Sequence, residues 1–187
     1  VLDRVDGSWG DFSSSDKNTS SAEMPMSAYK DGTIAFFRND SAYTFRVTED
    51  LGVDSLVYCP ELTGLGIDGT FAYDAARNKI YFSKKGKSEK NDLYEASWVD
   101  GTWAKVNMLT IKGVSAQTLT HKNSSLVVSR WVQQGRGASG FYNPSLGKDG
   151  SRIYFSGEFK AGQGARDLWY IDRESDGVWS RPKAIDT

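Results

Sequence analysis

The chain of 187 residues has very few of the side chains on which many active sites depend, with one cysteine and one histidine. Cys59 alone cannot form an internal disulfide, so the cysteine count leaves the cellular compartment open. A zinc site takes several Cys or His ligands, and a Cys–His nucleophile needs both partners in a suitable context. The sequence therefore disfavours both kinds of site, and we expect no metal, no cofactor and no catalytic residue.

Long hydrophobic runs and an excess of one charge are also missing. No apolar stretch approaches the ~20 residues of a membrane helix, and the N-terminus lacks the basic-then-apolar pattern of a signal peptide. The 23 basic and 24 acidic side chains give a net charge of −1. We therefore expect no transmembrane segment and no nucleic-acid partner. If the protein is exported, its signal has been removed or lies outside this chain.

The composition is otherwise that of a folded domain, with 39% hydrophobic and 13% aromatic residues. Such a chain is too apolar for disorder and long enough for one domain with a full core. Long stretches of helical periodicity are absent from the sequence. Repeats are therefore the pattern to look for first.

Two short motifs recur along the chain with a period of about 46 residues. Trp9 and Trp103, which end two copies of an Asp-Gly-x-Trp motif, lie 94 positions apart, or twice 47. Arg38, Ser83 and Ser129, which end three copies of a short apolar run, are separated by 45 and 46 positions. The copies of the two motifs are 6–9, 100–103 and 176–179 for the first, and 34–38, 80–83, 126–129 and 153–156 for the second.

Each repeat is predicted to contain four short strands. In the last repeat, the tight turn 148–150 leads into a strand over 151–156, rich in β-branched and aromatic residues. A second Asp-Gly turn separates 167–171 from 178–182, where Pro182 fits an edge strand because it has no ladder N–H. Four strands in each of several repeats indicate an all-β fold, a β-propeller of four-stranded antiparallel blades.

The predicted organisation is a single propeller domain over 1–187 that is part of a longer polypeptide. Ser129 and Ser156 are only 27 positions apart, about 19 short of a period, so the third blade lacks its outer strand. Either that strand has been lost, or residues that belong there are not included in this sequence. The second alternative is favoured because an amputated blade would expose a sheet edge. The segments are a half-blade at 1–16, blades at 23–61 and 67–111, an incomplete blade at 114–142 and a blade at 143–187.

Residues 143–156 resemble the repeat of TolB-like, WD40-like (PD40) β-propellers, and 167–182 resemble the version common in envelope proteins of Bacteroidota. The resemblance extends over essentially the whole chain and is strongest in the last blade. In that family the propeller often lies between tetratricopeptide repeats and an OmpA-like peptidoglycan-binding domain, as in a type IX secretion component. It implies a non-catalytic scaffold, periplasmic and outer-membrane associated, with envelope proteins as partners. Peptidoglycan would be bound only through a domain outside this chain.

Residue types that recur at one position of several blades are expected to be structural. Trp9, Trp103 and Trp179 are predicted to pack one sheet against its neighbour. The aspartates that precede glycine in the same motif fit turn chemistry. Asp92 and Asp167 occupy equivalent positions, so a structural hydrogen bond is favoured over a role in acid–base catalysis.

Charge placement predicts a partner site. The loops between the second and third strands (38–42, 84–91, 130–140 and 157–166) lie on one face of a propeller and carry nine basic residues. Their acids are only Asp40, Glu89 and Glu158. We name this the basic loop face and expect it to attract an acidic partner or an anionic glycan; the alternative is a set of screened, solubilising loops. The predicted partner-binding residues are Arg38, Lys84, Lys85, Lys87, Arg130, Trp131, Arg136, Lys160 and Arg166.

The opposite face is expected to be acidic, and the aromatic side chain of Trp131 is unusual on the basic one. The acids of the opposite turns are Asp6, Asp31, Glu49, Asp50, Asp54, Asp100, Asp149, Asp172, Glu174 and Asp176. The other blades carry Lys84 and Gly157 where the third carries Trp131, so an exposed Trp there would be a binding anchor. Alternatively it covers the mouth of the channel or lies under a missing segment.

Two functions are compatible with these patterns. The first is a non-catalytic protein-interaction scaffold of the bacterial cell envelope. The alternative is a glycan-binding or glycoside-hydrolase-type propeller that uses Trp131 and the nearby polar loops. A third possibility is the propeller of a larger peptidase whose hydrolase domain lies outside this chain.

Overall fold

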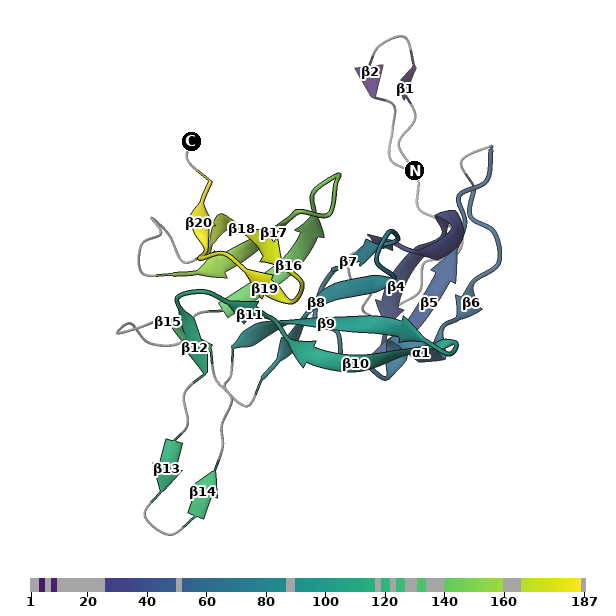
Figure 1. Ribbon diagram of the computed structural model, residues 1–187. Coiled ribbons are helices and arrows are strands. Elements are labelled where there is room, and N and C mark those ends of the chain that lie inside the picture. Colours follow the sequence, from purple (N-terminus) through teal and green to yellow (C-terminus); the bar gives the residue numbers. More distant parts are fainter. Residues whose placement is uncertain are drawn as a thin grey trace. The chain divides into compact units, whose positions relative to one another are not determined.

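In the computed structural model, the regular secondary structure of the described residues is almost all β-strand (Figure 1). The structure describes residues 26–49, 52–86, 90–114, 140–159 and 166–185 in full, and the backbone alone at 4–5, 8–9, 115–116, 119–121, 124–126 and 131–133. Two compact units divide at Pro60, the first over Val1–Pro60 and the second over Glu61–Thr187. No helix in the described ranges is long and apolar enough to cross a membrane.

The first unit contains one four-stranded antiparallel sheet in the order β3-β4-β5-β6. β4 and β5 are joined by Asn39 and Asp40, whose φ angles of 49° and 61° form a tight hairpin turn. Phe36, Phe37 and Phe45 are buried in this unit. Its elements are β1 (Arg4–Val5), β2 (Ser8–Trp9), β3 (Ser27–Ala28), η1 (Lys30–Gly32), β4 (Ile34–Arg38), β5 (Ser41–Phe45) and β6 (Val57–Tyr58); β1 and β2 form a separate hairpin.

The second unit begins with another four-stranded antiparallel sheet, in the order β10-β9-β8-β7. The turn from β9 to β10 is formed by Asp100 and Gly101, with φ angles of 48° and 80°, as the Asp-Gly motif predicts. A bulge at Lys105 (φ 51°) interrupts the edge strand β10. The elements are α1 (Pro60–Thr63), β7 (Phe71–Asp74), β8 (Lys79–Lys85), β9 (Asn91–Val99) and β10 (Thr102–Met108).

A further sheet of the second unit is built on three long antiparallel strands, β16 (Gly140–Leu146), β17 (Arg152–Glu158) and β18 (Asp167–Ser175). Two short strands, β19 (Val178–Trp179) and β20 (Lys183–Ala184), both pair with β18. β11 (Thr110–Ile111) then adds to β19 in parallel. Four more short strands form two antiparallel pairs, β12 (Val114–Ala116) with β15 (Trp131–Gln133) and β13 (Leu119–His121) with β14 (Ser124–Leu126).

The two larger sheets of the second unit pack face to face. The rings of Tyr81 on β8 and Trp179 on β19 meet edge to face, with centroids 5.6 Å apart. Phe159 packs on Trp169 at 4.6 Å between centroids and on Phe141 at 5.3 Å. The shared core consists of Ala72, Tyr81, Leu93, Leu109, Ile111, Val114, Phe141, Ile153, Phe155, Phe159, Trp169, Ile171 and Trp179.

The predictions of an all-β chain and of four-stranded antiparallel sheets are confirmed. Two details differ from a simple series of up-and-down blades. β16 is one strand that runs through 142 and 143, where the sequence suggested a blade boundary. The sheet of β7 to β10 and the sheet of β16 to β20, which flank the segment 114–142, contact each other directly. β11 follows β10 in the chain but pairs with the edge strand β19 of the other sheet. There Lys112 donates its backbone N–H to the Trp179 carbonyl.

Candidate functional site

The structure describes only part of the predicted basic loop face. The side chains of Lys87, Arg130, Arg136 and Lys160 lie outside the described residues. The backbone of Trp131 was expected in a loop but belongs to strand β15, opposite Ala116 of β12. Its side chain is also outside the described part, so its role as a binding anchor stays a prediction.

The described basic residues of the basic loop face, which are Arg38, Lys84, Lys85, Lys90 and Arg166, lie at or next to the ends of strands. Arg38, in the first unit, ends β4 with its guanidinium 5.4 Å from the centre of the Phe36 ring. Lys84 and Lys85 end β8 in the second unit, where Lys84 is half-buried and Lys85 is exposed. Arg166 precedes β18, and its guanidinium lies 3.9 Å from the Tyr142 ring centre.

Two of the basic segments of the second unit meet at one end of its sheets. Lys90, which precedes β9, forms an ion pair with Glu158 at the end of β17. Arg166 pairs with the same carboxylate, with Nε 3.3 Å from Oε1. The hydrogen bond from Lys90 is the largest effect and lowers the pKa of Glu158; burial opposes it, and the hydrogen bond from Arg166 adds to the lowering. One acid thus holds together the segments that carry Lys85 and Arg166.

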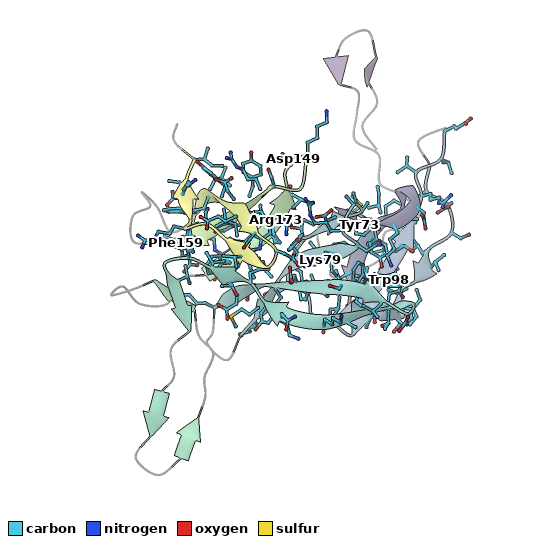
Figure 2. The ribbon with its side chains drawn as sticks, in the orientation of Figure 1. Tyr73, Lys79, Trp98, Asp149, Phe159 and Arg173 are labelled. Carbon is cyan, nitrogen blue, oxygen red and sulfur yellow. The ribbon has the colours of Figure 1, made fainter. Side chains whose placement is uncertain are left out.

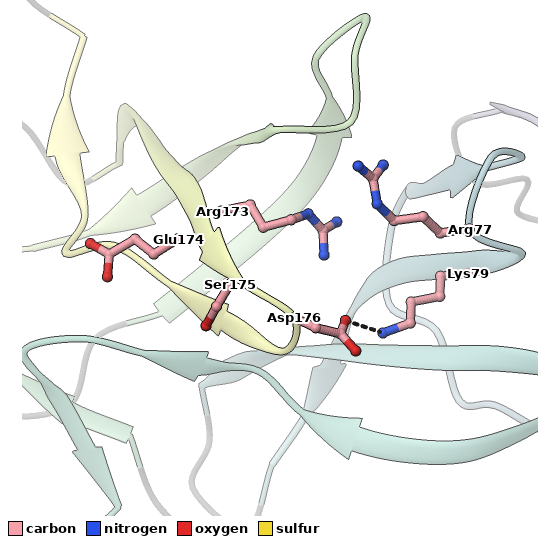
Figure 3. Close-up of a pocket in the computed structure, with 6 residues that line it drawn as sticks. All are labelled: Arg77, Lys79, Arg173, Glu174, Ser175 and Asp176. Carbon is pink, nitrogen blue, oxygen red and sulfur yellow. Dashed lines mark ion pairs between the residues drawn. The ribbon is translucent and has the colours of Figure 1, made fainter.

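The opposite end of the same strands contains a pocket of about 550 Å³. Lys79 at the start of β8 and Arg173 near the end of β18 come from different sheets, and both line this pocket (Figure 2). The other contributing segments are the β7–β8 turn and the β18–β19 turn. The lining residues are Arg77, Lys79, Arg173, Glu174, Ser175 and Asp176 (Figure 3).

Arg173 is the most firmly held residue of the pocket, with a side chain that is 11% exposed. Its guanidinium lies 4.4 Å from the centre of the Trp179 ring, a cation–π arrangement. Nη2 donates to Tyr81 Oη at 2.7 Å and to the Gly150 carbonyl at 3.3 Å. Burial raises the pKa of Tyr81, although the hydrogen bond from Arg173 opposes the shift, so the phenol stays protonated at neutral pH.

The other two cations are each paired with a carboxylate that is well shielded from water. Arg77 Nη1 lies 3.0 Å from Oδ2 of Asp74, whose side chain is 3% exposed. The hydrogen bond and the charge of Asp74 raise the pKa of Arg77. Lys79 Nζ lies 3.1 and 3.2 Å from the Glu95 oxygens. Burial is the largest single effect and disfavours the charged form of Lys79, but the hydrogen bond to Glu95 and the charge of Glu95 together outweigh it and raise the lysine pKa.

These contacts hold three cationic side chains in place around the pocket. The pKa values of Arg77 and Lys79 are shifted further above neutrality, so both groups keep their charge at physiological pH. Within the ranges that the structure describes, no three His, Cys, Asp or Glu side chains come together as a metal site would require. The pocket can therefore offer fixed positive charge and N–H donors.

The sequence analysis missed the three cations of this pocket because it counted charges in loops. At that end it singled out only acids, such as Asp149, Glu174 and Asp176. A signal was nevertheless present in the alternation of β18, where Trp169, Ile171 and Arg173 share one face. An arginine that continues a buried apolar face at the end of a strand is a candidate for a buried ion site.

The recurring tryptophans and aspartates can be placed in part. Trp179 is fully buried between the two sheets, which confirms its packing role. Trp103 is also buried, but its described ring contacts are Trp98 and Tyr73 of its own sheet, at 5.1 and 6.3 Å between centroids. The side chain of Trp9 lies outside the described residues. Asp92 is 2% exposed, in keeping with a structural position.

Comparison with known proteins does not assign this chain to a family. No protein-family model matches it, and no curated protein is significantly similar to it.

Proposed function

We propose that the chain is a non-catalytic protein-interaction scaffold of the β-propeller type. Two things support this proposal: the stacking of a four-stranded sheet on a six-stranded sheet in the second unit, and the resemblance of 143–182 to the propeller repeat of envelope proteins. Rigid stacked sheets with variable loops at their ends are typical of binding surfaces. The proposed location is the periplasm, in association with the outer membrane, with other envelope proteins as partners.

The observation that carries the binding proposal is the ion pair between Lys90 and Glu158. It brings strand ends from two sheets together, so Lys85 and Arg166 belong to one surface although they are far apart in the sequence. Lys85 is exposed and Arg166 is 53% exposed. An exposed basic surface on a rigid support accelerates and orients the encounter with an acidic partner.

The test is a pull-down from solubilised bacterial envelope with the chain immobilised, followed by identification of the captured proteins. We expect defined envelope proteins whose capture weakens as salt increases, because the interaction depends on exposed charge. The double variant Lys85→Glu/Arg166→Glu should lose most of this capture, with only a small fall in melting temperature from the loss of the exposed Arg166–Glu158 pair. Lys84 is left unchanged because it is half-buried against Gly66, with Cε 3.3 Å from where a Cβ on that glycine would lie.

A matched control is the double variant Lys105→Glu/Lys148→Glu, which makes the same change of charge at two exposed positions away from this end. The control should capture the same proteins as the wild type. Equal loss in both variants would mean that net charge, not this surface, determines binding, and would contradict the proposal. Peptidoglycan fragments are assayed in parallel, and capture of sugar alone would favour the glycan-binding alternative.

A further inference from the structure

One nitrogen of Arg173 lacks a hydrogen-bond partner in the described part of the chain. Nη2 is bonded to Tyr81 and Gly150, whereas Nη1 is buried and makes no hydrogen bond to any described residue. A buried donor on a charged group is costly when its hydrogen bond is not made. Trp179, Tyr81 and Gly150 already fix the guanidinium, so an acceptor that reaches Nη1, which other protein atoms cover in this structure, needs little reordering of the arginine.

The inner wall of the pocket also has one positive charge in excess. Arg77, Lys79 and Arg173 face only two shielded acids, Asp74 at 3% and Glu95 at 13% side-chain exposure. Both guanidinium groups are directed toward the space between the two sheets, one from each side (Figure 3). Asp74 lies between them, with Oδ2 3.0 Å from Arg77 and 3.7 Å from Arg173. A single carboxylate is thus shared by two arginines.

Three exposed acids near the pocket, Asp149, Glu174 and Asp176, compensate this charge weakly; Asp149 acts on Arg77, which is itself 39% exposed. Asp176 lies 3.5 Å from Lys79, but its side chain is 92% exposed, so solvent screens it. Glu174 pairs with Lys112 and is directed away from Arg173 (Figure 3). The excess positive charge is therefore presented to the interior of the pocket, beside the unpartnered Nη1.

We propose that this pocket binds a carboxylate group, which accepts hydrogen bonds from Arg173 and Arg77. The planar, forked guanidinium matches a carboxylate in shape, and such charge-assisted bonds are among the strongest in proteins. A monoanion balances the single excess charge, and about 550 Å³ is enough for a small carboxylic acid or the acidic end of a larger ligand. This inference is independent of the proposed scaffold function, because the pocket and the Lys85–Arg166 surface lie at opposite ends of the same strands.

The test is an NMR titration of the complete chain, labelled with ¹⁵N-arginine, with sodium acetate at constant ionic strength. The Nε–Hε signals of Arg173 and Arg77 should shift and saturate in the millimolar range, while the same concentrations of chloride leave them in place. Arg77→Gln should weaken acetate binding roughly fivefold or more, because it removes one charge-assisted donor. Arg166→Gln changes an exposed arginine at the other end and should leave the affinity unchanged.

Three outcomes would overturn the proposal. Shifts that grow linearly at all arginines would show only bulk ionic effects. Unchanged affinity in Arg77→Gln would show that the acetate is not held between the two guanidiniums. Tighter binding of inorganic phosphate than of acetate would assign the pocket to a different oxyanion. If Arg77→Gln fails to fold, Arg77→Lys keeps the charge without the fork and should still weaken binding.

Discussion

At the scale of single residues, a few side chains of the second unit both pack in the core and hold the guanidinium of Arg173 in position. Trp179 fills the core between the sheets and also provides the aromatic surface on which Arg173 rests. Tyr81 packs its ring edge to face against Trp179 and accepts a hydrogen bond from Arg173. Packing and charge placement are therefore coupled, because removal of the indole would disturb both the core and the guanidinium above it.

We predict that Trp179→Ala lowers the free energy of unfolding by about 3–5 kcal/mol, the usual result of emptying a buried aromatic site. The indole is fully buried, so its removal leaves a cavity with apolar walls in which water is not stabilised. Urea denaturation followed by circular dichroism measures the change. Leu168→Ala on the same sheet, at a side chain 62% exposed, should lose less than about 1 kcal/mol. Equal losses in the two variants would contradict the packing assignment.

At the scale of elements, the sheet of β16 to β20 has two chemically different faces. Ile153 and Phe155 of β17 point into the core, whereas Arg152 and Tyr154 alternate with them on the outer face. On that face Arg152 Nε lies 2.7 Å from Asp172 Oδ1. Cross-strand pairs of this kind fix the register of neighbouring strands, because a slip by one residue would bring the apolar set to the surface.

Stability should fall in acid because of the carboxylates that hold these strands together. The hydrogen bond from Lys183, then that of Arg152, lower the pKa of Asp172 below its ordinary 3.8, and burial opposes this only in part. A lowered pKa in the folded state stabilises the fold above the unfolded pKa, and this stabilisation is lost as pH falls through the folded value. Asp172→Asn should therefore reduce the difference between the urea midpoints at pH 7 and pH 3.

Glu158 gives a second case of the same effect, since Lys90 and Arg166 lower its pKa at the other end of the sheet. Glu158→Gln should also flatten the pH dependence, and the double variant should flatten it further because the two acids share no partner. A wild-type pH profile in Asp172→Asn would mean that the ion pairs on the outer face contribute nothing to stability in solution.

At the scale of the whole molecule, the repeat was sufficient to predict the class of fold but not the connections between sheets. The Asp-Gly motif and the apolar runs depend on local chemistry, and Asp100, Gly101 and Trp179 take the conformation or burial expected of them. The parallel pairing of β11 with β19 joins residues nearly 70 positions apart and leaves no local signal. The pocket was missed for the same reason, because Arg77 and Arg173 become neighbours only through the stacking of two sheets.

The arrangement of the second unit leads to a last prediction, about which strands open first. β8 has a hydrogen-bonded strand on either side, and Ile80, Tyr81 and Phe82 on it are fully buried. β10 is at the edge of that sheet and is interrupted by the bulge at Lys105. Amides open with a free energy set by local burial and pairing, so residues 79–85 should exchange with deuterium on the order of 100-fold more slowly than 104–108. Hydrogen exchange read by mass spectrometry on peptides from these segments measures the ratio. An uncovered, bulged edge strand protects its amides less than a central strand does. Equal protection of the two segments would therefore mean that the edge of β10 is covered in solution by another strand or another molecule.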